Sequence, residues 1–131
     1  MRFLIVDDDE SIHLYLQAVL APFAQCDSAM SGELGVDLFN EAHAEGLLYD
    51  VVMMDILMPG MDGHQTAEIL RAKEKEFGIN EYHQFKLVMI TSLVDDVNVS
   101  KAFFKTHASC YIVKPLDKEK IIDELRQNLI I

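Results

Sequence analysis

Four consecutive acidic residues, Asp7 to Glu10, follow directly on the apolar segment Arg2–Val6. Like charges repel one another, and a buried carboxylate without a partner is costly. Two explanations are open at this point. The four acids could lie in solvent at the start of a helix, where negative charge is favourable. Alternatively, some of them could hold a cation that offsets their charge.

Further residues that could take part in such a site follow other apolar segments of the chain. Asp55, Thr91 and Lys114 each come directly after a short run that could form a buried strand. The carboxyl ends of parallel strands meet at one edge of a sheet, where open α/β folds bind their ligands. With Asp7 and Asp8, that edge would hold three carboxylates, a hydroxyl and an amine. Because carboxylate oxygens suit Mg²⁺ or Mn²⁺, a cation site becomes the better explanation.

The rest of the chain supplies the elements that would position these residues. Four short apolar segments are predicted as strands: Arg2–Val6, Tyr49–Met54, Lys86–Ile90 and Cys110–Val113. Gln25–Ala29 is a further candidate strand, although it is less apolar. Amphipathic segments are predicted as helices: Ser11–Leu20, one capped by Ser31 that runs to about Glu45 and ends at Gly46, a helix through Thr66 to near Gly78, one from Asp95 or Asp96 to about Thr106, and one capped by Asp117. This alternation predicts one α/β domain over residues 1–131, a doubly wound five-stranded parallel sheet with helices on both faces.

The apolar periodicity also predicts which side chains the helices bury. For the second and last helices these are Leu34, Leu38, Phe39 and Ala42, and Ile121, Ile122, Leu125 and Leu129. The charged stretch Glu74–Gln84 is predicted to be a helix end followed by a surface loop. The five histidines are scattered without metal-ligand spacing, and no cluster of them is predicted at the acidic edge.

Composition excludes several classes of partner. The formal net charge of −11 argues against direct binding of nucleic acid or anionic membranes, which attract basic surfaces. Cys26 and Cys110 form no CxxC motif, so we expect buried thiols in a reducing compartment. Acidic residues stand where a signal peptide would need its apolar core, and no apolar run reaches membrane-spanning length. These features predict a cytoplasmic protein.

Four segments in order, FLIVDDDE, DVVMMDILMPGMDG, LVMITS and YIVKP, resemble the receiver domain of response regulators in two-component signalling. The resemblance covers nearly the whole chain and implies a flavodoxin-like sheet of order 2-1-3-4-5. It implies that Asp55 is the phosphoacceptor, which takes a phosphoryl group from the phosphohistidine of a histidine kinase or a histidine phosphotransfer protein. It also implies a downstream protein target, reached through the fourth helix, fifth strand and fifth helix.

The same resemblance assigns the metal ligands of an Mg²⁺ or Mn²⁺ site. Asp8 matches a direct ligand, and Asp7 matches a ligand that acts mainly through water. Asp55 and the backbone carbonyl of Leu57 match the other protein ligands.

Other positions match the family's charge-neutralising and switching residues. Lys114 matches the invariant lysine, and its bond to Pro115 is expected to be cis. Thr91 matches the switch hydroxyl and Tyr111 the aromatic switch position.

Two further expectations concern positions that vary in such domains. Leu57 and Leu93 stand two residues after Asp55 and Thr91, respectively. We expect these leucines to restrict the access of water and so to lengthen the lifetime of the phosphoryl group on Asp55. Phe104 is either an exposed partner contact or a peripheral packing residue.

One alternative function comes from the spacing Asp7-x-Asp9, which also fits the nucleophile motif of haloacid dehalogenase-type phosphohydrolases. Those enzymes use Mg²⁺ too, with Asp7 as the matching nucleophile. The C-terminal third here supplies Lys114 but no paired acids, so a signalling switch is favoured over an enzyme.

The start at Met1 and the absence of a trailing linker favour a natural single-domain chain over a piece of a longer protein. The sequence does not decide whether phosphorylation causes the protein to form a dimer.

Overall fold

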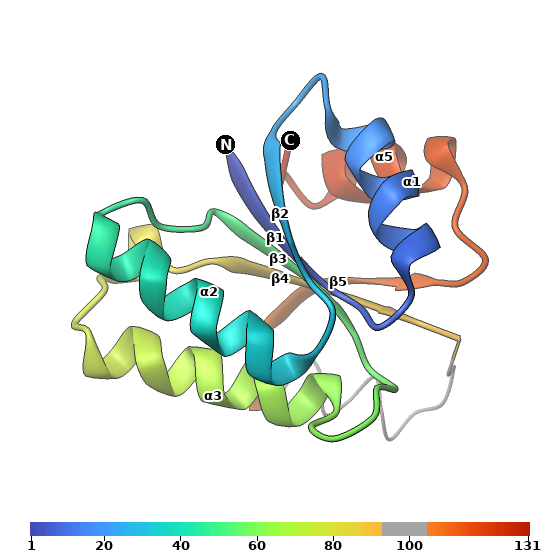
Figure 1. Ribbon diagram of the computed structural model, residues 1–131. Coiled ribbons are helices and arrows are strands. Elements are labelled where there is room, and N and C mark those ends of the chain that lie inside the picture. Colours follow the sequence, from blue (N-terminus) through green and yellow to red (C-terminus); the bar gives the residue numbers. More distant parts are fainter. Residues whose placement is uncertain (93–104) are drawn as a thin grey trace.

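The computed structural model describes residues 1–92 and 105–131. Its strands are β1 (Arg2–Val6), β2 (Gln25–Ala29), β3 (Val51–Asp55), β4 (Lys86–Thr91) and β5 (Ala108–Val113). Its helices are α1 (Glu10–Leu20), α2 (Gly32–Glu45), α3 (Gly63–Glu76), the short 3₁₀ helix η1 (Glu81–His83) and α5 (Lys118–Gln127). The strands form one parallel sheet of order β2-β1-β3-β4-β5, as predicted (Figure 1). Leu93, Phe104 and most of the helix predicted before β5 lie outside the described residues.

Helices cover both faces of the sheet, with α1 and α5 on one face and α2 and α3 on the other (Figure 1). Successive strand residues point to opposite faces. In β1, Phe3 and Ile5 therefore pack with α1 and α5, whereas Leu4 and Val6 pack with α2 and α3. This two-sided burial explains why β1, β3 and β4 are almost wholly apolar, whereas β2, at the edge of the sheet, is largely polar. Within the described ranges, no helix is both long and apolar enough to cross a membrane.

Side chains at the helix starts accept hydrogen bonds from the first turn, as expected for N-caps. Ser31 caps α2 and Asp117 caps α5, which confirms both predictions. Asp9 caps α1, so that helix begins one residue earlier than predicted. Gly46 ends α2 with a positive φ of 71°, a conformation that costs glycine little. The third and fourth strands extend one residue further than predicted, because Asp55 and Thr91 still pair with neighbouring strands.

Two predicted core residues are instead exposed. Leu34 is 49% exposed, because Gly32 and Gly35 place α2 close to its neighbours and turn Leu34 away from the sheet. Leu129 is 81% exposed, because α5 ends at Gln127 and the helical period no longer applies beyond it. Ile130 is buried in its place.

The stretch Glu74–Gln84, predicted as a helix end and surface loop, starts with a buried residue. The Glu74 carboxylate accepts hydrogen bonds from the Arg71 guanidinium and from the N–H of Phe85, each 2.8 Å long. Arg71 also donates to the carbonyl oxygens of Phe85 and Thr106. This buried ion pair therefore ties α3 to the start of β4 and to the segment before β5.

Candidate functional site

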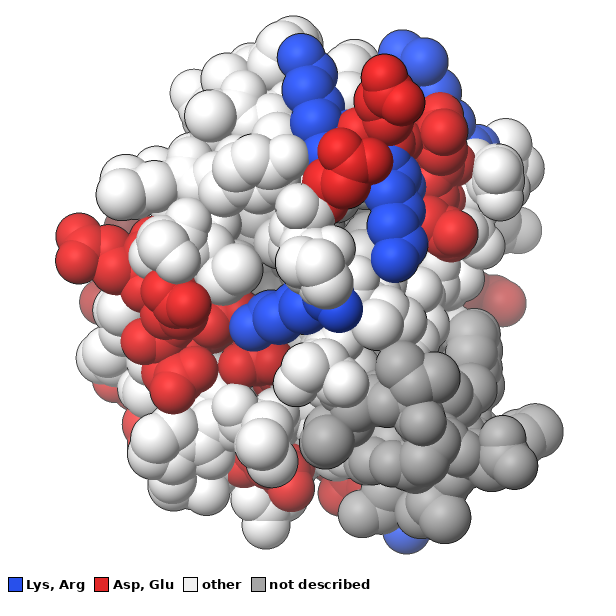
Figure 2. Space-filling model, turned by 90° about the vertical axis from the view of Figure 1, so that its right-hand side faces the viewer, with Lys and Arg blue, Asp and Glu red and all other residues white. Residues whose placement is uncertain are grey.

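Three carboxylates and one ammonium meet at the carboxyl-end edge of the sheet. Oxygen atoms of Asp7, Asp8 and Asp55 all lie within 4.8 Å of one another. The Nζ atom of Lys114 lies 3.1 Å from Asp7 Oδ2 and 3.5 Å from Asp55 Oδ1. Figure 2 looks onto this edge and shows acidic side chains gathered there beside a basic one. Of the five residues predicted to share this edge, the structure brings these four together.

Strand pairing explains how residues so far apart in sequence converge. Asp55 ends β3, and strand alternation points it to the same face as Val51 and Met53, toward α1 and α5. The ladder continues past β1, because the N–H of Asp7 donates to the carbonyl of Ala29 over 3.1 Å. In the same way, the N–H of Lys114 donates to the carbonyl of Thr91 over 2.8 Å. The Lys114-Pro115 peptide bond is cis, as expected.

The backbone that carries Asp55 is also packed tightly against the start of α3. The N–H of Gly63 donates to the carbonyl of Ile56 over 2.7 Å. A Cβ atom at Gly63 would lie 2.1 Å from the carbonyl oxygen of Asp55 and 2.8 Å from Cα of Ile56. Only a residue without a side chain fits there, because the colliding atoms are backbone.

Gly63→Ala is therefore expected to lower the free energy of unfolding by at least about 2 kcal/mol. Urea unfolding measures this change. Gly35→Ala serves as the control, because its new Cβ atom would meet side-chain atoms of Val6 at 3.1 Å, which can shift. If Gly63→Ala were as stable as the parent protein, the close packing of Gly63 against the backbone of Asp55 and Ile56 would not require glycine.

Burial and like charge shape the protonation of the cluster. Asp55 is 5% exposed, and burial together with the Asp7 carboxylate raises its pKa from 3.8 to about 6. Burial disfavours the charged form of Lys114, but its hydrogen bond to Asp7 and the charges of Asp55 and Asp7 outweigh this and raise its pKa. One ammonium thus faces three carboxyl groups, and the site holds an excess of negative charge.

This donor set fits a small divalent cation. Mg²⁺ and Mn²⁺ prefer carboxylate oxygens and commonly keep several waters. Asp7 and Asp55 are buried and held by Lys114, whereas Asp8 is exposed and could contact a hydrated ion. Leu57 lies in the loop after β3 with an exposed side chain, and the role of its carbonyl as a ligand stays a prediction.

The two predicted switch residues lie on the opposite face of the sheet from Asp55. Thr91 ends β4 and is fully buried, and it pairs with Val113 of β5. Tyr111 stands two residues before Val113, so its side chain shares a face with Thr91 and lies diagonally from it. Tyr111 is half-buried and packs against the core beneath α2 and α3. The structure thus places the two side chains on one face of the sheet and on neighbouring strands.

The sequence analysis missed one residue of the site, His13. Its ring lies in the core at the acidic edge, and its Nε2–H group donates to the backbone carbonyl of Asp7 over 2.7 Å. The sequence analysis predicted only that histidines would not cluster at this edge, and it gave His13 no role. A signal was present in the sequence: His13 stands three residues before Leu16, on the apolar stripe of the helix that follows the acids.

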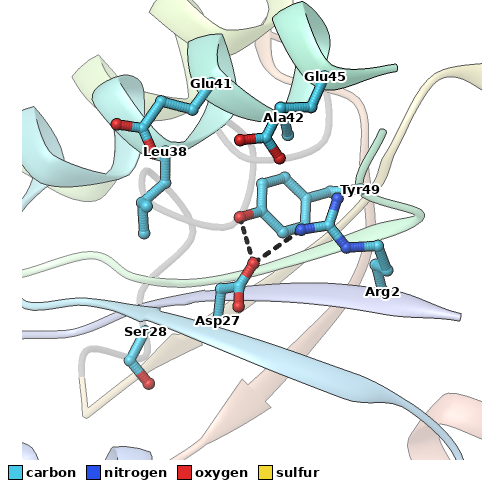
Figure 3. A pocket seen from close by; sticks show the side chains of 8 residues that line it. All are labelled: Arg2, Asp27, Ser28, Leu38, Glu41, Ala42, Glu45 and Tyr49. Atoms are coloured by element: carbon cyan, nitrogen blue, oxygen red, sulfur yellow. Dashed lines mark hydrogen bonds and ion pairs between the residues drawn. The ribbon is translucent and has the colours of Figure 1, made fainter. Parts of the chain in front are cut away.

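A pocket of about 320 Å³ lies away from this edge, between α2 and the strands β1 and β2 (Figure 3). Its lining residues are Arg2, Asp27, Ser28, Leu38, Glu41, Ala42, Glu45 and Tyr49. Asp27 Oδ2 accepts hydrogen bonds from the Arg2 guanidinium (2.9 Å) and the Tyr49 hydroxyl (2.7 Å). Burial and the Asp27 carboxylate raise the pKa of Tyr49. None of the predicted site residues lines this pocket.

Comparison with known proteins finds a family and several relatives. A family model described as the response regulator receiver domain matches residues 3–126. The chemotaxis protein CheY of Treponema pallidum is 35% identical over 130 residues, which cover 98% of this chain and 82% of that protein. CheY of Halobacterium salinarum is 34% identical over 130 residues, which cover 98% of this chain and 96% of that protein. The response regulator protein VraR of Staphylococcus saprophyticus is 28% identical, and the matched region spans only 56% of its length.

Solved structures agree on the fold. The CheX–CheY–BeF₃–Mg²⁺ complex of Borrelia burgdorferi matches with a TM-score of 0.83 and 26% identity, over 100% of this chain and 90% of that one. CheY4 of Vibrio cholerae matches with a TM-score of 0.78 and 21% identity, over 96% of each chain, and this likeness concerns the fold alone.

Proposed function

The chain belongs to the response-regulator receiver family of two-component systems, and from this membership and the geometry around Asp55 we propose that it is a phosphoacceptor switch. Residues 1–131 would form one receiver domain. The observation that carries the proposal is the convergence of Asp7, Asp8, Asp55 and Lys114 at one sheet edge. The donor would be the phosphohistidine of a histidine kinase or of a histidine phosphotransfer protein.

In the proposed reaction, a carboxylate oxygen of Asp55 attacks the phosphorus atom of phosphohistidine. A P–O bond forms, the P–N bond breaks, and the imidazole leaves with the electron pair and takes up a proton. Only the ionised carboxylate is a nucleophile, and a cation held beside Asp55 would favour that ionised form against the burial that raises its pKa. The product is an aspartyl phosphate on Asp55 and a free histidine on the donor.

Phosphoryl transfer depends mostly on positioning and on offsetting negative charge. The Lys114 ammonium, already 3.5 Å from Asp55, would contact a phosphoryl oxygen. The Thr91 hydroxyl would bond another oxygen once Thr91 has moved toward it. Asp7 would keep Lys114 in place through their 3.1 Å contact.

A divalent cation, Mg²⁺ or Mn²⁺, would be held by Asp8, by Asp55 and by the backbone carbonyl of Leu57, with Asp7 acting through water. When bound, it would offset carboxylate charge and the charge on the transferring phosphoryl group. The fit of the oxygen donors within 4.8 Å supports this assignment. The solved CheX–CheY complex, which carries BeF₃ and Mg²⁺, supports it by similarity.

The output of the switch would pass through Thr91 and Tyr111. Because the two side chains share a sheet face, a Thr91 that moves toward the phosphoryl group would open space for Tyr111. The surface of β5, α5 and the predicted fourth helix would then bind its protein target differently. The fourth helix lies outside the described residues, so this part rests on family membership.

Intact mass after incubation with Mg²⁺ and acetyl phosphate tests the proposal. We expect one added phosphoryl group on the parent protein, none with EDTA and none on Asp55→Asn. If Asp55→Asn is still modified and only Asp7→Asn loses the label, Asp7 is the nucleophile and the hydrolase alternative replaces the switch. If no form is modified, beryllofluoride binding in the presence of Mg²⁺ decides whether the site is active.

A further inference from the structure

His13 is a buried polar side chain with one hydrogen bond to the described part of the chain. Its side chain belongs to the buried stripe of α1 with Leu16, Val19 and Leu20, and the residue is 3% exposed. A carbonyl oxygen can only accept, so Nε2 carries the proton that bonds the Asp7 carbonyl. The buried Nδ1 atom has no hydrogen-bond partner in residues 1–92 and 105–131. Among the described residues, the Asp7 carbonyl is thus the hydrogen-bond partner of the His13 ring.

That carbonyl belongs to the peptide unit that joins Asp7 to Asp8. Because a peptide unit is planar, fixing the direction of its carbonyl also fixes the N–H and Cα atoms of Asp8. The remaining groups of Asp7 are held separately. Its N–H donates to the Ala29 carbonyl, Oδ1 accepts from the Asp9 N–H (2.9 Å), and Oδ2 accepts from Lys114. His13 is therefore the side chain that fixes the link between the two acids.

Asp8 depends on this link more than Asp7 does. Its side chain is exposed, and it has no hydrogen bond or ion pair within the described part of the chain. Even so, one of its oxygens lies within 4.8 Å of oxygens of Asp7 and Asp55. The direction of its backbone thus decides whether its carboxylate faces the cluster.

We propose that His13 is a positioning residue for the cation site, which fixes the Asp7–Asp8 peptide so that the Asp8 carboxylate faces Asp7 and Asp55. This inference rests on the proposed function, because it needs the acidic cluster to bind Mg²⁺. His13 contacts no cation itself. Its loss would weaken Mg²⁺ binding although all three carboxylates remain.

Isothermal titration of the unphosphorylated protein with Mg²⁺ tests this role. His13→Phe keeps a buried ring without a donor, and we expect about a tenfold rise in the Mg²⁺ dissociation constant, typical of lost outer-shell support. His13→Gln can place an amide N–H near the position of Nε2, and we expect it to recover most of the affinity. His13→Asn is too short to reach and is expected to resemble His13→Phe. It replaces that variant if His13→Phe does not fold.

Val19→Ala is the matched control, because it destabilises the same helix without touching Asp7. We expect it to lower the melting temperature and leave the Mg²⁺ dissociation constant unchanged. Unchanged Mg²⁺ affinity in a folded His13→Phe or His13→Asn protein overturns the inference. So does an equal loss in Val19→Ala, which would mean general destabilisation.

The ring of His13 also gives a readout that needs no metal. Nitrogen-15 NMR of the imidazole is expected to show the proton on Nε2, and a neutral ring with its proton on Nδ1 overturns the proposed bond. If the proposed cation site does not exist, the titration of the parent protein will already show no Mg²⁺ binding. That result would remove both conclusions, whereas loss of the His13 effect alone would leave the proposed function standing.

Discussion

Asp55→Asn is expected to stabilise the metal-free protein by about 3 kcal/mol at pH 7.5 and by about 1 kcal/mol at pH 4.5. The reason is the pKa of Asp55, which burial and the Asp7 carboxylate raise from 3.8 to about 6. At pH 7.5 the folded protein must keep a largely desolvated carboxylate ionised next to a second acid. Asparagine has nearly the same shape and carries no charge to desolvate.

The direction of the pH dependence follows from proton binding. A carboxyl group whose pKa is raised by folding binds a proton more tightly in the folded state than in the unfolded state. The folded state therefore loses stability as the pH rises from about 4 to about 6, and it keeps the full penalty above that range. Asp55→Asn removes this penalty, so the difference between the two proteins should grow across the same range.

Urea unfolding in EDTA at several pH values measures this difference. Asp37→Asn, an exposed acid on α2, is the control and should change stability by no more than about 0.5 kcal/mol at any pH. An Asp55→Asn protein that is less stable than the parent at pH 7.5 would contradict the assigned electrostatics. Mg²⁺ should narrow the gap, because a bound cation stabilises only the protein that retains the carboxylate.

Lys114→Met is expected to slow phosphorylation by acetyl phosphate about 100-fold or more, because it removes a charge aimed at the transferring phosphoryl group. The Nζ atom bridges Asp7 and Asp55 at 3.1 and 3.5 Å. Without it, two buried carboxylates would face each other with no cation between them. We therefore also expect a loss of about 2 kcal/mol in the free energy of unfolding at pH 7.5 without metal.

A double-mutant cycle with Asp55→Asn tests whether the loss of stability comes from the two facing carboxylates. In the Asp55→Asn background, Lys114→Met should cost less stability, because only Asp7 still needs the ammonium. Lys73→Met is the control, since Lys73 forms a partly exposed pair with Glu76 at 3.4 Å, away from the site. Mass spectrometry over time measures the rate of phosphorylation. If Lys114→Met is phosphorylated as fast as the parent protein, Lys114 takes no part in the reaction.

Local sequence signals predicted the element order well. Apolar runs marked four of the five strands, and Ser31, Gly46 and Asp117 marked helix ends through side-chain and backbone preferences that act over a few residues. The same reasoning failed where packing overrides local periodicity. Leu34 turns outward because Gly32 and Gly35 take the close contacts of α2, and Leu129 lies beyond the end of its helix.

The sequence by itself determined which residues could carry the proposed chemistry: acids at the ends of the first and third strands, Thr91 at the end of the fourth and Lys114 after the fifth. Parallel strand order then requires these ends to share an edge. Only the tertiary structure decided the distances between them and the raised pKa of Asp55, because burial and charge pairing depend on residues far apart in the chain. It also decided that His13 holds the Asp7 carbonyl, since a histidine on an apolar stripe does not reveal which backbone atom its ring will meet.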